Sequence, residues 1–104
     1  MTPKQILQAA RDLITPPERW TTGWYARDKD GAETDSKSPD AVCWCTLGAV
    51  NKFSPDIHQE LEENEALRVL MVAMKTPWPS RFNDTHTHAE VLAAFDAAIA
   101  SLED

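Results

Sequence analysis

The sequence contains little of several features that define common protein classes. Its 104 residues include only two Cys, three Gly and one Tyr, and Asp and Glu outnumber Lys and Arg by 17 to 10, which gives a net charge of −7. Two cysteines are too few for a disulfide scaffold, and no apolar run approaches the roughly eighteen residues of a membrane-spanning helix. Because contacts to phosphate require clustered Lys and Arg, we expect no direct binding to nucleic acid or to a membrane.

The composition otherwise fits one small globular domain, which we expect to span residues 1–104. Hydrophobic residues make up 42% of the chain and charged residues 26%, and a chain of this length can bury one core. The first residues do not show the pattern of a secretory signal. Cys43 and Cys45 are too close in sequence for an unstrained disulfide, so we expect free thiols and a cytoplasmic protein.

Three Ser-Pro or Thr-Pro pairs predict helix starts. Thr2-Pro3 predicts a first helix that ends at the prolines 16 and 17. Ser38-Pro39 predicts a second helix with its body at 41–50, and we expect this helix to be central because nearly all its side chains are small or apolar. Gly48 within it suggests a close approach of another helix. Ser54-Pro55 predicts a short third helix.

The remaining elements follow from caps and turns. Asn64 is a candidate N-cap for a longer helix that ends before Pro77, a loop is expected at 80–86, and Thr87 with Glu90 forms a capping-box pattern for the last helix. The aromatic and Thr-rich stretch 18–28, followed by Asp30-Gly31, predicts a β-hairpin. The predicted fold is therefore mostly α, with four to five helices around a central apolar helix and a β-hairpin inserted after the first helix.

Four motifs in a fixed order resemble a family of small uncharacterised bacterial and phage-borne proteins, a domain of unknown function. They are R-W-x-x-G-x-x-A-R-D at 19–28, C-x-x-G-A at 45–49, F-N-D at 82–84 and E-V-L-x-x-x-D-x-A-I at 90–99. The family pattern has Trp where this chain has Phe82. The resemblance implies a single domain over most of the chain and no particular reaction.

The thiols suggest two kinds of chemistry. Cys43, His88 and Asp84 are the residue types of a cysteine hydrolase, and a helix N-terminus would lower the pKa of Cys43. Cys43, Cys45, His86 and His88 offer four ligands of the kind that structural zinc uses. On the predicted helix, however, residues two apart point about 200° away from each other, which disfavours zinc. We therefore expect buried structural cysteines, no cofactor and no metal, and keep the hydrolase and the zinc domain as alternatives.

Two further groups of residues suggest binding. Charged and polar residues interleaved with Trp predict either a hydrogen-bonded lock between the hairpin and the helices or a shallow polar pocket: Arg19, Trp20, Trp24, Arg27, Asn83 and Asp84. A run of acidic residues predicts a solvated helix face that could dock a basic protein: Asp56, Glu60, Glu62, Glu63 and Glu65. The resulting hypothesis is a small acidic, non-enzymatic module that binds a protein and could form a homodimer through exposed aromatic residues.

Overall fold

The computed structural model describes residues 1–54 and 64–102, and within these ranges it contains five α-helices and a small sheet. The helices are α1 (Pro3–Ile14), α2 (Thr46–Phe53), α3 (Glu65–Met74), α4 (Pro79–Thr85) and α5 (His88–Ser101). The strands are β1 (Ala26–Arg27), β2 (Glu33–Thr34) and β3 (Cys43–Trp44), and a single 3-10 turn, η1, covers Pro17–Arg19. The prediction of a mostly α fold with a hairpin after the first helix is confirmed.

The first and last helices begin with the capping boxes that the sequence predicts. Thr2 accepts a hydrogen bond from the Gln5 N–H while the Gln5 side chain accepts from the Thr2 N–H, and Thr87 and Glu90 repeat the arrangement at α5. Each box satisfies two backbone N–H groups that a helix start otherwise leaves unpaired. These local signals therefore fix where α1 and α5 begin.

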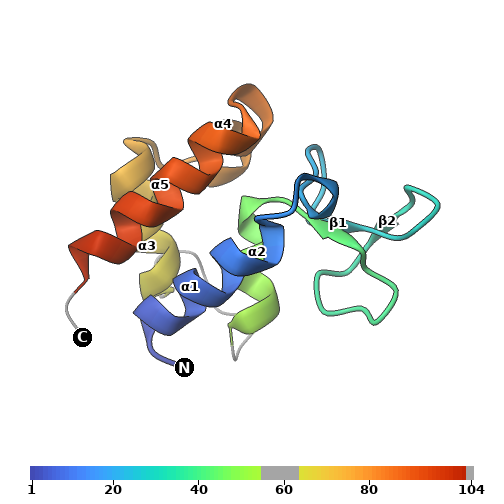
Figure 1. Ribbon diagram of the computed structural model, residues 1–104, viewed down its shortest axis with the longest axis horizontal. Coiled ribbons are helices and arrows are strands. Elements are labelled where there is room, and N and C mark those ends of the chain that lie inside the picture. The colour runs from blue at the N-terminus through green and yellow to red at the C-terminus, as the bar shows by residue number, and fades with distance from the viewer. Residues whose placement is uncertain (55–63, 103–104) are drawn as a thin grey trace.

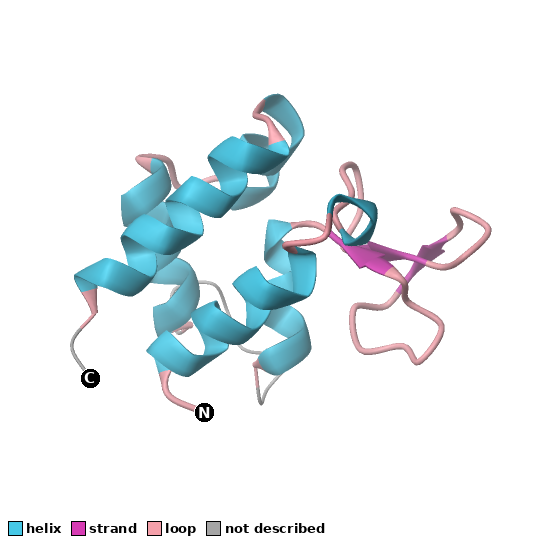
Figure 2. Cartoon of the chain, in the orientation of Figure 1, coloured by secondary structure: helices cyan, strands magenta, loops and turns pink. Residues whose placement is uncertain are grey.

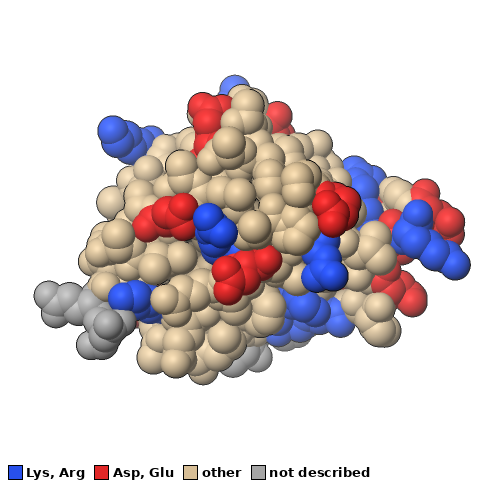
Figure 3. Space-filling model, viewed as in Figure 1, with Lys and Arg blue, Asp and Glu red and all other residues tan. Residues whose placement is uncertain are grey.

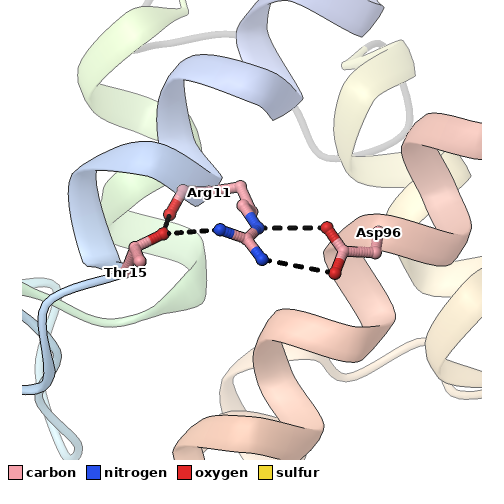
Figure 4. A network of polar contacts seen from close by, with 3 residues as sticks. All are labelled: Arg11, Thr15 and Asp96. Atoms are coloured by element: carbon pink, nitrogen blue, oxygen red, sulfur yellow. Dashed lines mark hydrogen bonds and ion pairs between the residues drawn. The ribbon is translucent and has the colours of Figure 1, made fainter.

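Helices α1 and α5 lie side by side and run in opposite directions (Figure 1). They bury Leu7, Ile14 and Phe95 fully in the core, together with residues of α3 and α2. On the outside, the Arg11 guanidinium of α1 forms an ion pair with Asp96 of α5 at 3.0 Å and also donates to the Thr15 hydroxyl (Figure 4). An exposed pair of this kind contributes roughly 0.2–1 kcal/mol, so apolar burial provides most of the free energy that joins the two helices.

The sheet lies at one end of the molecule, beyond the ends of α1 and α2 (Figure 2). Its order is β2-β1-β3 and both pairings are antiparallel, with Ala26 opposite Thr34 on one side and opposite Trp44 on the other. The turn between β1 and β2 is held by Asp28, whose carboxylate accepts from the N–H groups of Asp30 and Ala32. The hairpin prediction is confirmed, and the third strand is a feature that the sequence analysis missed.

The predicted second helix is wrong in its first half. Cys43 and Trp44 form β3 rather than helix, and α2 begins only at Thr46, where the Cys45 thiol accepts the Gly48 N–H. The free edge of β1 provides backbone partners for residues 43 and 44, and the Trp44 indole N–H donates to the buried carbonyl of Ser36. Tertiary pairing therefore overrides the helix-start pattern at Ser38-Pro39.

Gly48 makes a close approach, but to an extended segment rather than to a helix. A Cβ atom on Gly48 would lie 1.9 Å from the Tyr25 carbonyl oxygen and 2.7 Å from its carbon. The same carbonyl accepts the Cys45 N–H at 3.1 Å. Only glycine therefore lets the start of α2 lie against the chain that leads into β1.

The segment after α3 also differs from expectation. Helix α3 starts at the predicted cap Asn64 and ends at Met74, before Pro77 as predicted, with Lys75 in the left-handed conformation at φ 58°. Residues 79–85 form α4 instead of the expected loop, with Pro79 in its first turn. Proline ends a helix when it is inside one but fits the first turn of the next, which the sequence analysis did not consider here. The predicted short helix after Ser54 lies outside the described residues.

Candidate binding site

Asn83 of α4 is the centre of a buried polar network. Its side chain is fully buried, and its Oδ1 accepts from the Trp20 indole N–H at 2.7 Å and from both the N–H and the hydroxyl of Thr46 at 2.9 Å. Its Nδ2 donates to the Thr21 carbonyl at 3.0 Å and to Asp84 at 3.2 Å. One amide thus joins α4 to the start of α2 and to the segment that precedes the sheet.

Asp84 extends this network to the surface. Its Oδ1 accepts the Gly23 N–H at 3.1 Å in addition to the Asn83 amide. The carboxylate lies in the wall of a hollow of about 200 Å³, which we call the Asp84 hollow; its other lining residues are Gly23, Trp24, Tyr25, Cys45 and Ser80. Trp24 is 42% exposed there and packs edge-on against Tyr25.

Cys45 also lines this hollow and is almost entirely buried. Burial raises the pKa of the Cys45 thiol above its ordinary value, and the negative charge of Asp84 raises it further. Hydrogen bonds from the Gly48 and Leu47 N–H groups act in the opposite direction but do not outweigh burial. The nucleophile in thiol catalysis is the thiolate, which this environment disfavours at neutral pH.

The structure brings together part of the predicted binding group. The partly buried Trp20 is hydrogen-bonded to the fully buried Asn83, and Trp24 and Asp84 line the hollow. Arg27 lies beside them with a different role, because its guanidinium donates to the carbonyls of Thr22 and Gly31. Arg19 is exposed in η1, and the hollow is lined without it. Four lining residues were outside the predicted binding group: Gly23, Tyr25, Cys45 and Ser80. Gly23 and Cys45 are motif positions, which was the available signal for them, and Cys45 had been considered only as a zinc ligand.

The three residues of the alternative hydrolase are not assembled. The Cys43 thiol lies 3.9 Å from the Arg27 carbonyl on the sheet, whereas the His88 Nε2 lies 2.6 Å from the Ile14 carbonyl and its ring packs on Trp20. The Asp84 carboxylate instead accepts hydrogen bonds from the Gly23 N–H and the Asn83 side-chain amide. Cys43 is also on strand β3 and not at the N-terminus of α2, which begins at Thr46. The thiol that does share a hollow with Asp84 is Cys45.

The alternative zinc site is also not formed. Cys45 is turned toward the start of α2, and the His86 ring stacks on Phe82 at 3.7 Å while its Nδ1 bonds the Phe82 carbonyl. Within residues 1–54 and 64–102, no three His, Cys, Asp or Glu side chains lie close enough to hold one metal ion. Both thiols are free.

A second, apolar surface lies along α3 and the start of α4, and the sequence analysis missed it. Two adjoining hollows of about 620 and 420 Å³ meet at Pro77, and we call them together the α3–α4 surface. Val72 is 78% exposed and Trp78 is 62% exposed on this surface. Val72 lies off the apolar stripe of the predicted helix and Trp78 lies just beyond its predicted end, which was the available signal for an exposed apolar patch.

Cationic side chains surround this apolar surface. Arg68 and Lys75 line the first hollow and Arg81 lines the second, whereas Glu65 provides the one carboxylate in their lining. By contrast, the face of the molecule shown in Figure 3 has Lys and Arg interspersed with Asp and Glu. The α3–α4 surface thus combines exposed apolar side chains with locally positive charge, although the whole chain is acidic.

The predicted acidic docking face is only partly within the described residues. Glu65 lies in the first turn of α3, where its charge suits the positive end of the helix. The other four residues, Asp56, Glu60, Glu62 and Glu63, lie outside the described residues. Within the described ranges, no helix combines the length and apolar character needed to cross a membrane.

Comparison with known proteins gives one match. A family model described as a family of unknown function, DUF6197, matches residues 1–101. No curated protein and no solved structure matches the chain. The match covers the network around Asn83, the Asp84 hollow and the α3–α4 surface.

Proposed function

Since the chain belongs to DUF6197, a family of unknown function, its role must come from its own surfaces, and we propose that it is a non-enzymatic module that binds an acidic amphipathic segment of another protein on its α3–α4 surface. The observation that carries this proposal is the exposure of Val72 and Trp78 above two adjoining hollows. Large apolar side chains in contiguous hollows are typical of protein-binding surfaces.

The charge of the lining residues selects the kind of partner. The lining of the α3–α4 surface contains three cationic side chains, Arg68, Lys75 and Arg81. It contains a single carboxylate, that of Glu65. A helix with apolar side chains on one face and Asp or Glu at its edges would complement this pattern. The partner of this surface is therefore acidic, in contrast to the basic partner proposed for the acidic residues 56–65.

The remaining chemistry supports binding rather than catalysis. The thiol in the Asp84 hollow is held protonated by its raised pKa, and Cys43, His88 and Asp84 make separate contacts. Two free thiols suit a reducing compartment, which supports the cytoplasmic location proposed from sequence.

A pair of synthetic helical peptides tests the proposal. One carries Leu on one face with Glu at its edges, and the matched peptide has Lys in place of every Glu. Fluorescence anisotropy near physiological ionic strength should show the Glu peptide binding at least about tenfold more tightly, as two or three partly exposed ion pairs would provide. Equal affinities, or no binding of the Glu peptide, would refute the proposal.

Matched variants locate the binding. Val72→Asp should lower the affinity of the Glu peptide at least about tenfold, because it places a carboxylate in the apolar contact. Val42→Asp is the control, since Val42 is also exposed but lies beside β3. Circular dichroism establishes that both variants fold. If the two variants bind the Glu peptide equally well, the surface has been assigned wrongly.

A further inference from the structure

We propose that the Asp84 hollow is a separate recognition site for one basic side chain, Lys or Arg, of a protein partner. The walls supply the two groups that recognise an organic cation, a carboxylate from Asp84 and an aromatic ring from Trp24. Ser80 adds a hydroxyl that can accept a hydrogen bond from an ammonium or guanidinium group. This inference rests on the proposed function only in that a protein supplies the side chain.

The carboxylate is held in position before any ligand arrives. The Gly23 N–H and the Asn83 amide both donate to the Asp84 Oδ1, and Asn83 is itself fixed by bonds to Trp20, Thr21 and Thr46. Both bonds engage one oxygen, which leaves Oδ2 as the acceptor for a cation. A preorganised acceptor loses little conformational entropy on binding.

Other ligand classes fit this hollow less well. Its volume of about 200 Å³ is below the roughly 300–1,000 Å³ of sites that enclose a drug-sized molecule, so it suits a single side chain. The negative charge of Asp84 opposes phosphate and carboxylate ligands. In the described part of the chain, this carboxylate belongs to no group of three or more His, Cys, Asp or Glu side chains that could hold a metal ion.

The position of the hollow also connects it to a protein partner. Ser80 lines both the Asp84 hollow and the neighbouring hollow that contains Trp78. A segment bound on the α3–α4 surface would therefore reach Asp84 past Ser80. A basic side chain at that end and acidic side chains near Arg68 and Lys75 would fix the direction in which the segment lies.

Small amino-acid amides test the hollow alone. N-acetyl-arginine methylamide and N-acetyl-lysine methylamide should each produce saturable NMR shifts of the Trp24 indole N–H and the Gly23 amide. N-acetyl-norleucine methylamide has a similar length without the charge and should produce no saturable shift. Because these probes lack the apolar face of the Glu peptide, their result is independent of whether the α3–α4 surface binds that peptide.

Asp84→Asn is the decisive variant, because it removes the charge but keeps an oxygen that can accept the Gly23 N–H. It should weaken binding of the arginine and lysine amides by up to about fivefold, the loss of one partly exposed ionic contact. Asp40→Asn removes the same charge at an exposed position elsewhere and should change nothing. Equal binding by norleucine amide, unchanged affinity in Asp84→Asn, or no saturable shift with either cation would each overturn the inference.

Discussion

At the scale of single residues, Asn83 is a buried polar side chain that connects elements distant in sequence. It is the residue of the F-N-D motif that lies fully buried, and its amide joins α4 to two other parts of the chain, residues 20–21 and Thr46. The residue after it, Asp84, is exposed and lines the hollow. Of these two adjacent polar residues, Asn83 stabilises the fold and Asp84 is available to a ligand.

Replacing Asn83 tests this role. Asn83→Ala leaves the Trp20 indole and the N–H and hydroxyl of Thr46 without their acceptor, so we expect the free energy of unfolding to fall by about 3–5 kcal/mol. That is a large part of the roughly 5–15 kcal/mol of a small domain. Urea denaturation provides the measurement. Ser80→Ala, at an exposed position of the same helix, should stay within about 0.5 kcal/mol, and equal values for both variants would contradict this account.

The two thiols should differ in reactivity. Cys43 is partly exposed, whereas Cys45 is buried and the pKa of its thiol is raised, first by burial. At neutral pH we therefore expect iodoacetamide to label Cys43 of the native protein first and Cys45 only after unfolding. Mass spectrometry identifies the labelled site, and Cys43→Ser isolates the reaction at Cys45. Rapid labelling of Cys45 in the folded Cys43→Ser variant would show that the hollow admits a reactive thiolate.

At the scale of elements, the caps and the close approach at Gly48 decide where helices begin. Thr2, Thr87, Asn64 and Cys45 each accept a backbone N–H at a helix start. The first three use oxygen and follow familiar sequence patterns, whereas the Cys45 sulfur is an uncommon cap. This difference explains why three starts were predicted correctly and the start of α2 was not.

Gly48→Ala tests the packing of α2 against the segment before β1. In an open helix this change usually stabilises by up to about 1 kcal/mol, but here the new methyl group would overlap the Tyr25 carbonyl. Because the neighbour is backbone and cannot rotate away, we expect a loss of about 2–4 kcal/mol in thermal or urea unfolding. Hydrogen exchange of the Cys45 amide, which bonds the Tyr25 carbonyl, should accelerate as well. A more stable variant would contradict the close approach.

Glu90 should make the stability of α5 depend on pH. The Thr87 backbone N–H lowers the pKa of the Glu90 carboxyl below its ordinary 4.5, so the folded state binds fewer protons than the unfolded state. The stabilisation is complete above pH 4.5 and is lost as the pH falls through the lower value of the folded protein. Glu90→Gln keeps the oxygen but cannot ionise, so the difference in unfolding free energy from the natural chain should shrink below pH 4.5. A difference that does not change with pH would exclude this role.

At the scale of the whole molecule, local charge and net charge have opposite signs at the proposed docking surface. The chain carries −7, yet Arg68, Lys75 and Arg81 surround exposed apolar side chains. The net negative charge of the chain therefore repels an acidic partner at long range, whereas the three cations attract it at short range. Self-association through the exposed Trp24 and Tyr25 stays a prediction, as does the absence of direct nucleic-acid binding.

Ionic strength should separate the two effects. At about 0.01 M salt the screening length is about 30 Å, so the Glu peptide encounters the whole negative chain, whereas at about 0.15 M it is about 8 Å and local cations dominate. At about 1 M even close pairs are screened. The preference for the Glu peptide over the Lys peptide should therefore be greatest at intermediate salt. Arg68→Glu should remove this maximum, and a preference that only rises or only falls with salt would contradict the proposed balance.

The sequence by itself determined the features that depend on neighbouring residues. The capping boxes, the Asp-Gly turn and the helical spacing of α1 and α5 are local, because each hydrogen bond or buried face involves residues a few positions apart. The mostly α fold also followed from these patterns, whereas the contact of Trp20 with Asn83 was only a hypothesis until the structure placed them together. The acidic docking face remains a prediction, since only Glu65 lies within the described residues.

Tertiary structure decided the rest, because the deciding partners are distant in sequence. Residues 43 and 44 became a strand since β1 offered an open edge, and Cys45 rather than Cys43 reached Asp84 because α2 begins later than predicted. The Asp84 hollow joins segments about sixty residues apart, as the bond from the Gly23 N–H to Asp84 shows. Local propensity is worth less than about 1 kcal/mol per residue, whereas a buried polar network or a paired strand is worth several, so the long-range contacts prevail.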